Sequence, residues 1–291
     1  MTVLTQVLNG LQLGSIYALV ALGYTMVYGI IQLLNFAHGD IIMVGGYIAW
    51  VTMTMLGLPP VAAVILAIAG CMLLGVTIDK IAYAPLREAP RLSILITAIG
   101  VSYFLENGAQ LVFGANAKVV PAIANLGTIQ VGDMTVSATS LLVVLVLVVS
   151  TVVLTFLVQK TKLGKAMRAV SEDMGAARLM GINVNTTISF TFALGSALAG
   201  IGAVLYCMAY SQINPTMGVM LGTKAFVAAV LGGIGSVPGA VIGGLVVGLA
   251  EAMVSAVGLS VWQDAVVFLL LIIVLVIRPT GLLGRPMTEK V

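Results

Sequence analysis

The chain alternates long apolar stretches with short groups of charged residues or of glycine and proline. Splitting it at those groups leaves eight apolar stretches, at residues 9–34, 41–57, 60–78, 93–113, 139–159, 186–208, 222–258 and 262–277. Most approach or exceed the ~20 residues with which a helix spans a bilayer, and none has the alternating pattern of a membrane barrel strand. Because backbone groups inside lipid must pair within their own segment, we predict an all-α, polytopic bundle of about eight membrane helices.

The composition supports a membrane setting. Hydrophobic residues make up 60% of the 291 residues and charged residues only 8%, whereas roughly 25% of a soluble domain is charged. Residues 1–39, 41–78 and 179–223 contain no Asp, Glu, Lys or Arg. The net charge of +3 comes from neither a basic face nor a basic tail, so we expect no nucleic-acid partner. Cys71 and Cys207 lack the spacing of metal ligands, which predicts neither a disulfide nor a zinc site.

Basic residues gather in three groups that predict the orientation of the chain. These groups hold eleven of the 13 Lys and Arg residues: Lys80, Arg87 and Arg91, then Lys160, Lys162, Lys165, Arg168 and Arg178, then Arg278, Arg285 and Lys290. Loops rich in Lys and Arg stay in the cytoplasm. We therefore place these groups inside and residues 114–138 and 209–221 outside.

This orientation requires the stretch 222–258 to enter the membrane and return. Its centre is rich in residues that break helices, so we predict helix breaks there, at Gly232, Gly233, Gly235, Pro238 and Gly239. The first half has a matching irregularity at residues 35–40, where we predict a break at Gly39. Paired interruptions in two halves are typical of a transporter site. The pattern leaves eight or nine crossings open, and it does not orient the N-terminus.

The longest polar segment, residues 160–185, forms the predicted cytoplasmic loop. We expect a helix of eight or nine residues in it, with Ser171 as N-cap and Glu172 and Asp173 in the first turn. Arg178 falls in the last turn, and Gly181 is placed to end the helix in the left-handed conformation. Met174, Ala177 and Met180 are predicted to share one face. Such a helix either lies on its own protein or enters a groove on a soluble partner.

Polar residues within the apolar stretches are candidates for a translocation pathway. Tyr17, Tyr24, Tyr28, Gln32 and Asn35 follow steps of seven, four, four and three residues, which predicts one face of the first helix. This face either lines a path for zwitterions or makes hydrogen bonds between packed helices.

Two carboxylates stand deep in apolar stretches. They are Glu106, with Tyr103 and Gln110 one turn away on either side, and Glu251. Acids at such positions usually face the bundle interior and often mark a path, although near a boundary they reach the headgroups instead.

The sequence favours a non-enzymatic role. His38 is the only histidine and has no nucleophile at motif spacing, so no catalytic triad is predicted. A proton relay between His38 and Asp40 is one reading of that pair, and satisfaction of backbone groups freed by the break is the other. The chain also lacks the G-x-x-x-x-G-K-[ST] phosphate loop. We expect no cofactor in this chain and an energy source outside it.

Three segments together resemble one family. SEDMGAARLMGIN at residues 171–183 resembles the ATPase-docking segment, or coupling helix, of ABC-importer permeases that import branched-chain amino acids. The run from Gly10 through Gly14, Tyr17 and Gly23 to NFAHGD at 35–40 looks like the opening of the LivH-type permease. AAVLGGIGSVPGAVIGG at 228–244 is similar to the second glycine-rich signature of that family. The resemblance covers nearly the whole chain.

The resemblance implies a single permease domain over residues 1–291, with the coupling-helix loop at 160–185. Its expected partners are a second, LivM-type permease, two cytoplasmic ATPases that use ATP and magnesium, an extracytoplasmic amino-acid-binding protein, and the lipid bilayer of the bacterial inner membrane. The implied cargo is leucine, isoleucine and valine. A related ABC permease for urea or amides, and an ion-driven secondary transporter, remain the alternatives.

Overall fold

The structure is a computed structural model that describes residues 3–32, 35–87, 89–124, 127–131 and 134–284. It confirms the predicted helical membrane architecture. The described residues include seven helices that are long and apolar enough to cross a membrane, and α9 is a shorter apolar helix.

The first half of the chain forms five long helices. They are α1 (Val3–Ile31), α2 (His38–Thr54), α3 (Pro60–Ile78), α4 (Arg91–Phe113) and α5 (Ala138–Lys160). A π-helical turn, η1 (Asp79–Tyr83), and a 3-10 turn, η2 (Ala84–Leu86), prolong α3.

The second half begins with two short helices, α6 (Lys162–Glu172) and α7 (Met174–Leu179). The helices α8 (Val184–Tyr210), α9 (Met217–Gly232) and α10 (Val237–Ala256) follow. The 3-10 turn η3 (Ser260–Trp262) leads into α11 (Gln263–Ile277).

Four short strands lie at one end of the bundle, and sequence analysis missed them. β1 (Lys118–Val119) pairs antiparallel with β4 (Gln212–Ile213), and β2 (Thr128–Val131) pairs antiparallel with β3 (Met134–Ser137). They are only two or four residues long, too short for a periodic signal. The β1–β4 pair joins two loops that the prediction placed on the same side of the membrane.

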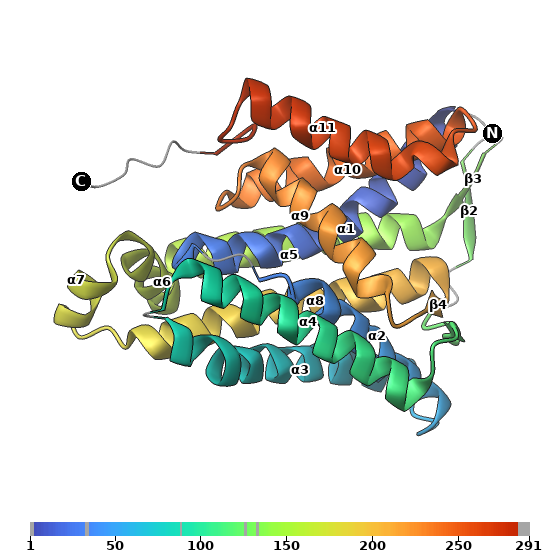
Figure 1. The fold of residues 1–291 in the computed structure, drawn as a ribbon. Helices are drawn as coiled ribbons and strands as arrows, with labels where there is room; N and C mark the ends of the chain where they lie inside the picture. The colour runs from blue at the N-terminus through green and yellow to red at the C-terminus, as the bar shows by residue number, and fades with distance from the viewer. Residues whose placement is uncertain (1–2, 33–34, 88, 125–126, 132–133, 285–291) are drawn as a thin grey trace.

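Helix α1 lies at the centre of the molecule, between α10 and α8 (Figure 1). Small residues let these backbones approach closely. A Cβ atom added to Gly14 would lie 2.8 Å from the carbonyl oxygen of Gly244 on α10, too close for a real contact. The packing of α1 on α10 therefore depends on glycine.

The two ends of the bundle differ in the elements that they carry. In Figure 1, α6, α7, η1 and the end of α11 lie at one end, and the strands and the start of α1 lie at the other. The described elements of the three basic groups thus gather at the end of α6 and α7, as the predicted orientation requires, and Arg285 and Lys290 lie outside the described residues. We call this the docking end.

The predicted break in the second half is present. Helix α9 ends at Gly232, and Gly233 and Gly235 have φ values of 103° and 91°, which only glycine adopts readily. The breaks predicted at Pro238 and Gly239 are wrong by a few residues, because both lie in the first turn of α10, where the Ser236 hydroxyl accepts a hydrogen bond from the Gly239 N–H (3.2 Å). The 16 residues of α9 span about 24 Å at ~1.5 Å per residue.

The predicted break at Gly39 is wrong by a few residues. Helix α1 ends at Ile31 and α2 begins at His38, so the interruption precedes Gly39, which lies in the first turn of α2. The glycine serves close packing instead. A Cβ atom on Gly222 of α9 would lie 2.9 Å from the Cα of Gly39.

Candidate functional site

Asp173 caps the N-terminus of α7. Its Oδ1 atom accepts hydrogen bonds from the backbone N–H groups of Gly175 (2.8 Å) and Ala176 (2.9 Å). The prediction of Ser171 as N-cap is wrong, because Ser171 lies in the last turn of α6 and its hydroxyl donates to the Arg168 carbonyl (2.7 Å). Glu172 is the last residue of α6 and is not in the first turn of α7. The extended backbone at Asp173 separates the two helices.

The C-terminus of α7 is closed by a Schellman motif. Gly181 has φ 78°, as predicted, and its N–H donates to the Arg178 carbonyl (3.0 Å). The Ile182 N–H donates to the Ala177 carbonyl (3.0 Å). One residue later, the Asn183 Oδ1 atom accepts from the Thr186 N–H (3.1 Å) and caps α8. Helix α7 is therefore capped at both ends, and a short turn joins it to the capped start of α8.

The apolar side chains of α7 do not share one face as predicted. Ala177 is buried, whereas Met180 is 81% exposed and Met174 is 37% exposed. Helix α7 has only six residues, so Met180 lies beyond its last turn. Leu179, which the sequence analysis did not single out, is 90% exposed. Leu179 and Met180 therefore form the apolar surface of this segment.

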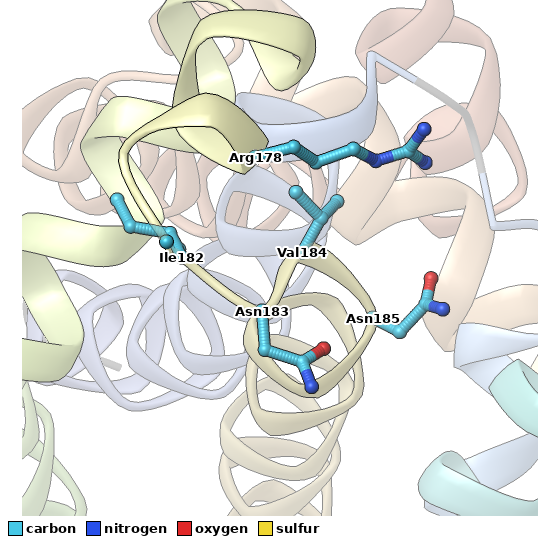
Figure 2. A pocket seen from close by; sticks show the side chains of 6 residues that line it. Arg178, Ile182, Asn183, Val184 and Asn185 are labelled. Atoms are coloured by element: carbon cyan, nitrogen blue, oxygen red, sulfur yellow. The ribbon is translucent and has the colours of Figure 1, made fainter.

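A pocket of about 330 Å³ opens beside the turn between α7 and α8, lined by Arg178, Gly181, Ile182, Asn183, Val184 and Asn185. Figure 2 shows Arg178 and Asn185 pointing to the same side of the turn, and Ile182 pointing away from them. Arg178 lies in the last turn of α7, as predicted, where a cation interacts favourably with the helix dipole.

A group of polar side chains around the buried Asp79 joins the start of α8 to the end of α3. The Arg87 guanidinium forms an ion pair with the fully buried Asp79 (2.6 Å) and donates a hydrogen bond to the Asn185 side chain. The Ser189 hydroxyl donates to the second oxygen of Asp79 (2.6 Å). We call Asp79, Arg87, Asn185 and Ser189 the docking-end cluster. Both oxygens of its carboxylate are bonded.

Tyr83 extends this cluster to the interruption between α1 and α2. Its hydroxyl donates to the Oδ1 atom of Asn35 (2.7 Å), and its ring packs against Phe192 of α8, with ring centroids 5.5 Å apart. Tyr83 lies one turn from Asp79 and one turn from Arg87 along the chain. Polar contacts thus join the first turn of α8 to the extension of α3, and the Tyr83 hydroxyl joins that extension to Asn35, three residues before α2.

A second group of polar side chains, around the buried Glu251, lies toward the other end of the bundle. Lys224 of α9 forms ion pairs with Glu251 of α10 (2.6 Å) and with Asp264 of α11 (2.8 Å). The Tyr17 hydroxyl of α1 donates to Glu251 (2.8 Å). We call Tyr17, Lys224, Glu251 and Asp264 the far-end cluster. It ties four helices together.

The predicted polar face of the first helix is only partly present. Helix α1 ends at Ile31, so Gln32 and Asn35 lie beyond it, and Gln32 has a left-handed φ of 51°. Tyr17 and Tyr24 are buried among neighbouring helices, and Tyr28 is half-buried. The ring of Tyr24 packs edge-on against His38, with centroids 4.8 Å apart. For Tyr17, the packed hydrogen-bonded interpretation is the one that the contacts favour.

Helix α4 brings a second set of polar residues to α2. The Ser102 hydroxyl donates to the Oδ2 atom of the buried Asp40, and Glu106 lies one turn after Ser102 on the same side of α4. Among the described side chains, no Lys, Arg or His lies within 4.0 Å of either carboxylate. Tyr103 is exposed and Gln110 is half-buried, one turn on either side of Glu106.

Several of these residues were not identified from the sequence. Lys224 is the only Lys or Arg between residues 179 and 277, and a lone intramembrane lysine requires an acidic partner, so this signal was available. Asp79 and Asn185 gave no such signal, because each stands next to a predicted loop, where a polar residue is ordinary. In the described parts of the chain, no group of three His, Cys, Asp or Glu residues is arranged to hold a metal.

Comparison with known proteins gives a consistent result. Residues 6–275 match the family model described as branched-chain amino acid transport system / permease component. The chain is 46% identical to the high-affinity branched-chain amino acid transport system permease protein BraD of Pseudomonas aeruginosa, over 99% of this chain and 98% of that protein. It is 44% identical to the LivH permease protein of the same kind of system in Escherichia coli K12, over 99% and 97%. A solved structure titled PsaBC from Streptococcus pneumoniae in complex with Fab covers 94% of this chain and 91% of its own, with 15% identity and a TM-score of 0.49.

Proposed function

The chain belongs to the permease-component family of branched-chain amino acid transport systems, and we propose that it carries leucine, isoleucine and valine through the bacterial inner membrane as one subunit of an ATP-driven ABC importer. Its partners in this proposal are a second, related permease, two cytoplasmic ATPases and an extracytoplasmic amino-acid-binding protein. The ATPases bind ATP and magnesium, and this chain moves in response.

The observation that carries the proposal is the α6–α7 segment. It presents Leu179 and Met180, which are almost fully exposed, at the docking end of the bundle. We infer that these two neighbouring apolar side chains contact a partner subunit. The caps at Asp173, Gly181 and Asn183 fix both ends of α7 and the start of α8, which favours transmission of a movement from one helix to the next.

The docking-end cluster supports a route for that movement. A displacement of α7 moves the first turn of α8, which Asn185 and Ser189 connect to Arg87 and Asp79. Tyr83 connects the same turn of the α3 extension to Asn35. Allosteric coupling needs an element with two arrangements between the two sites, and the interruption before α2 is our candidate for it.

The first experiment is purification of the tagged chain from its native membrane in mild detergent, with mass spectrometry of what co-purifies and an ATPase assay of the eluate. We expect two soluble ATPases and a second permease. Recovery of the chain alone, active in liposomes under an ion gradient, would favour a secondary transporter instead.

A surface variant tests the docking segment directly. Leu179→Asp places a charge on the exposed apolar surface and is expected to reduce recovery of the ATPases at least tenfold while the chain still inserts. The matched control is Val261→Asp, because Val261 is 94% exposed in η3 at the opposite end. Equal recovery of ATPases with both variants would remove α7 as the docking site.

A binding assay tests the cargo. The binding protein that co-purifies with, or is encoded beside, this permease is titrated with leucine, isoleucine, valine, urea and acetamide. Binding of urea or acetamide in preference to the amino acids would replace the cargo and leave the importer assignment intact.

A further inference from the structure

The exposed membrane helices of this chain differ in the chemistry of their outer surfaces. Helices α4, α5 and α11 are each largely unburied within the chain. Every exposed residue of α5 between Leu141 and Phe156 is Leu, Val or Phe, and every exposed residue of α11 from Ala265 to Ile277 is aliphatic, Ala or Phe. Those two surfaces suit lipid.

The outer surface of α4 does not suit lipid. Helix α4 has the lowest mean hydropathy of the seven candidate membrane spans. Its exposed residues include Tyr103 and Asn107, and Glu106 and Gln110 are half-buried. Asn107 lies five residues from the middle of α4, about 7.5 Å along the axis at ~1.5 Å per residue, well inside the ~30 Å hydrocarbon layer. Amide and carboxylate groups at that depth face protein or water and avoid lipid.

Two glycines on the same helix point to a protein neighbour. A Cβ atom added to Gly100 or Gly108 would meet no atom of this chain within 4 Å. Glycine in a helix interior costs about 1 kcal/mol relative to alanine, and within this chain neither glycine serves a close contact. The two glycines share one face of α4 with three other residues, at steps of four, three, one and three residues along the helix. The face consists of Gly100, Phe104, Asn107, Gly108 and Leu111.

We propose that this face of α4 is the surface on which the second, related permease subunit packs. The proposal rests on the proposed function and deepens it. The occupant must lie in the membrane, because the face reaches the middle of a spanning helix, and neither a soluble ATPase nor a binding protein reaches there. Small residues admit a close helix, and the side-chain oxygen of Asn107 accepts its donor groups, while the Asn107 amide nitrogen donates to the Tyr103 carbonyl (2.7 Å).

The acidic side chains near α4 lie away from this face. Glu106 follows Phe104 by two residues, about 200° around the helix at 3.6 residues per turn. It is therefore on the side of Ser102, which donates to the buried Asp40 of α2. The proposed surface is uncharged, and Asn107 is its polar residue.

Photo-crosslinking tests the proposal in the intact complex. A benzophenone amino acid replaces Phe104 of α4, which is 77% exposed, and separately Phe156 of α5, which is 62% exposed. We expect the probe at position 104 to crosslink to the second permease, and the probe at position 156 to react with lipid only. A crosslink from position 156 alone, lipid adducts alone at both positions, or a crosslink from position 104 to another copy of this chain would each overturn the proposal.

Substitution of the open glycine gives an independent measurement. Gly108→Leu fits the isolated chain, because nothing lies near an added Cβ, and leucine is the better helix former. We expect normal insertion and at least tenfold less recovered second permease, whereas the control Val148→Leu on α5 keeps full recovery. Unchanged recovery with Gly108→Leu would overturn the proposal. If the wild-type chain recovers the second permease, a variant that behaves like wild type contradicts the α4 surface and not the proposed function. If the wild-type chain recovers no second permease, the proposed function and the α4 surface are both overturned.

Discussion

The two charged clusters, each centred on a buried carboxylate, hold the bundle together in different ways. In the docking-end cluster one carboxylate faces one guanidinium, and neutral Asn185 and Ser189 complete the hydrogen bonds. In the far-end cluster one lysine serves two carboxylates, Glu251 and Asp264. The first is balanced in charge and joins two neighbouring segments, and the second carries an excess negative charge and joins four helices.

This difference indicates a division of roles. The docking-end cluster lies one turn from the segment that we propose to bind the ATPases, so it is placed to transmit movement. The far-end cluster joins α1, α9, α10 and α11 around a lysine whose loss would leave a buried acid unpaired. We expect changes in the first cluster to alter transport more than stability, and changes in the second to do the reverse.

Lys224→Met should have the largest effect. It leaves Glu251, which is 2% exposed, without its cation, and removal of one partner of a buried pair costs about 3–5 kcal/mol. Thermal unfolding in detergent should show a clearly lowered Tm. Lys224→Arg is the control that keeps the charge, and the double variant Lys224→Met/Glu251→Gln should recover part of the loss. An unchanged Tm in Lys224→Met would mean that the lysine does not hold the four helices.

Asp79→Asn should have the next largest effect on stability and the largest on coupling. It removes the charge that the Arg87 guanidinium faces, at a cost of about 1–3 kcal/mol. We expect the complex to assemble and hydrolyse ATP while uptake per ATP falls at least fivefold. The readout is the ratio of transport to hydrolysis in liposomes. If uptake and hydrolysis fall together, the cluster only supports the fold.

Asn185→Ala tests with a smaller change whether the docking-end cluster transmits movement from α8. It removes the contact between α8 and Arg87 and leaves the Arg87–Asp79 ion pair in place. One hydrogen bond contributes about 0.5–1.5 kcal/mol, so Tm should move little, while the ratio of transport to hydrolysis should fall. Thr186→Ala, one residue further along α8, is the control and should keep the wild-type ratio.

Asp264→Asn should have the smallest effect. The Asp264 side chain is 47% exposed, and exposed ion pairs contribute about 0–1 kcal/mol. Lys224 keeps Glu251 as its partner. A drop in Tm as large as that of Lys224→Met would show that Asp264 contributes as much to stability as Glu251. The buried Glu251 would then not be the main partner of Lys224.

The sequence predicted the helices better than the contacts between them. Apolar length and the glycine-rich centre of 222–258 were sufficient for the membrane helices and for the break after Gly232, because both depend on local chemistry. The same reasoning placed the first break at Gly39, since a glycine required for close contact with α9 has the same appearance as one that ends a helix. Spacing also extended the polar face of α1 to Gln32 and Asn35, although the helix ends at Ile31.

The candidate site was predicted in its location and missed in its detail. Gly181 was identified because a left-handed residue after a helix has a sequence signature. Ser171 was preferred over Asp173 as the cap because nothing in the local pattern shows that α6 continues to Glu172. Ser189, which bonds Asp79, and Tyr17, which bonds Glu251, lie 110 and 234 residues from those acids, and a single sequence contains no direct signal for such distant pairs.

The central position of α1 has a consequence for how the protein is made. Tyr17 and its hydrogen-bond partner Glu251 are 234 residues apart, and at ~5–20 residues per second a ribosome needs roughly 12 to 47 s to synthesise that interval. The first helix to enter the membrane therefore waits for α10, one of the last to be made. During that time its glycines and tyrosine hydroxyls face lipid or the insertion machinery, so the yield of this subunit should depend on the speed of translation and on what shelters α1 in the meantime.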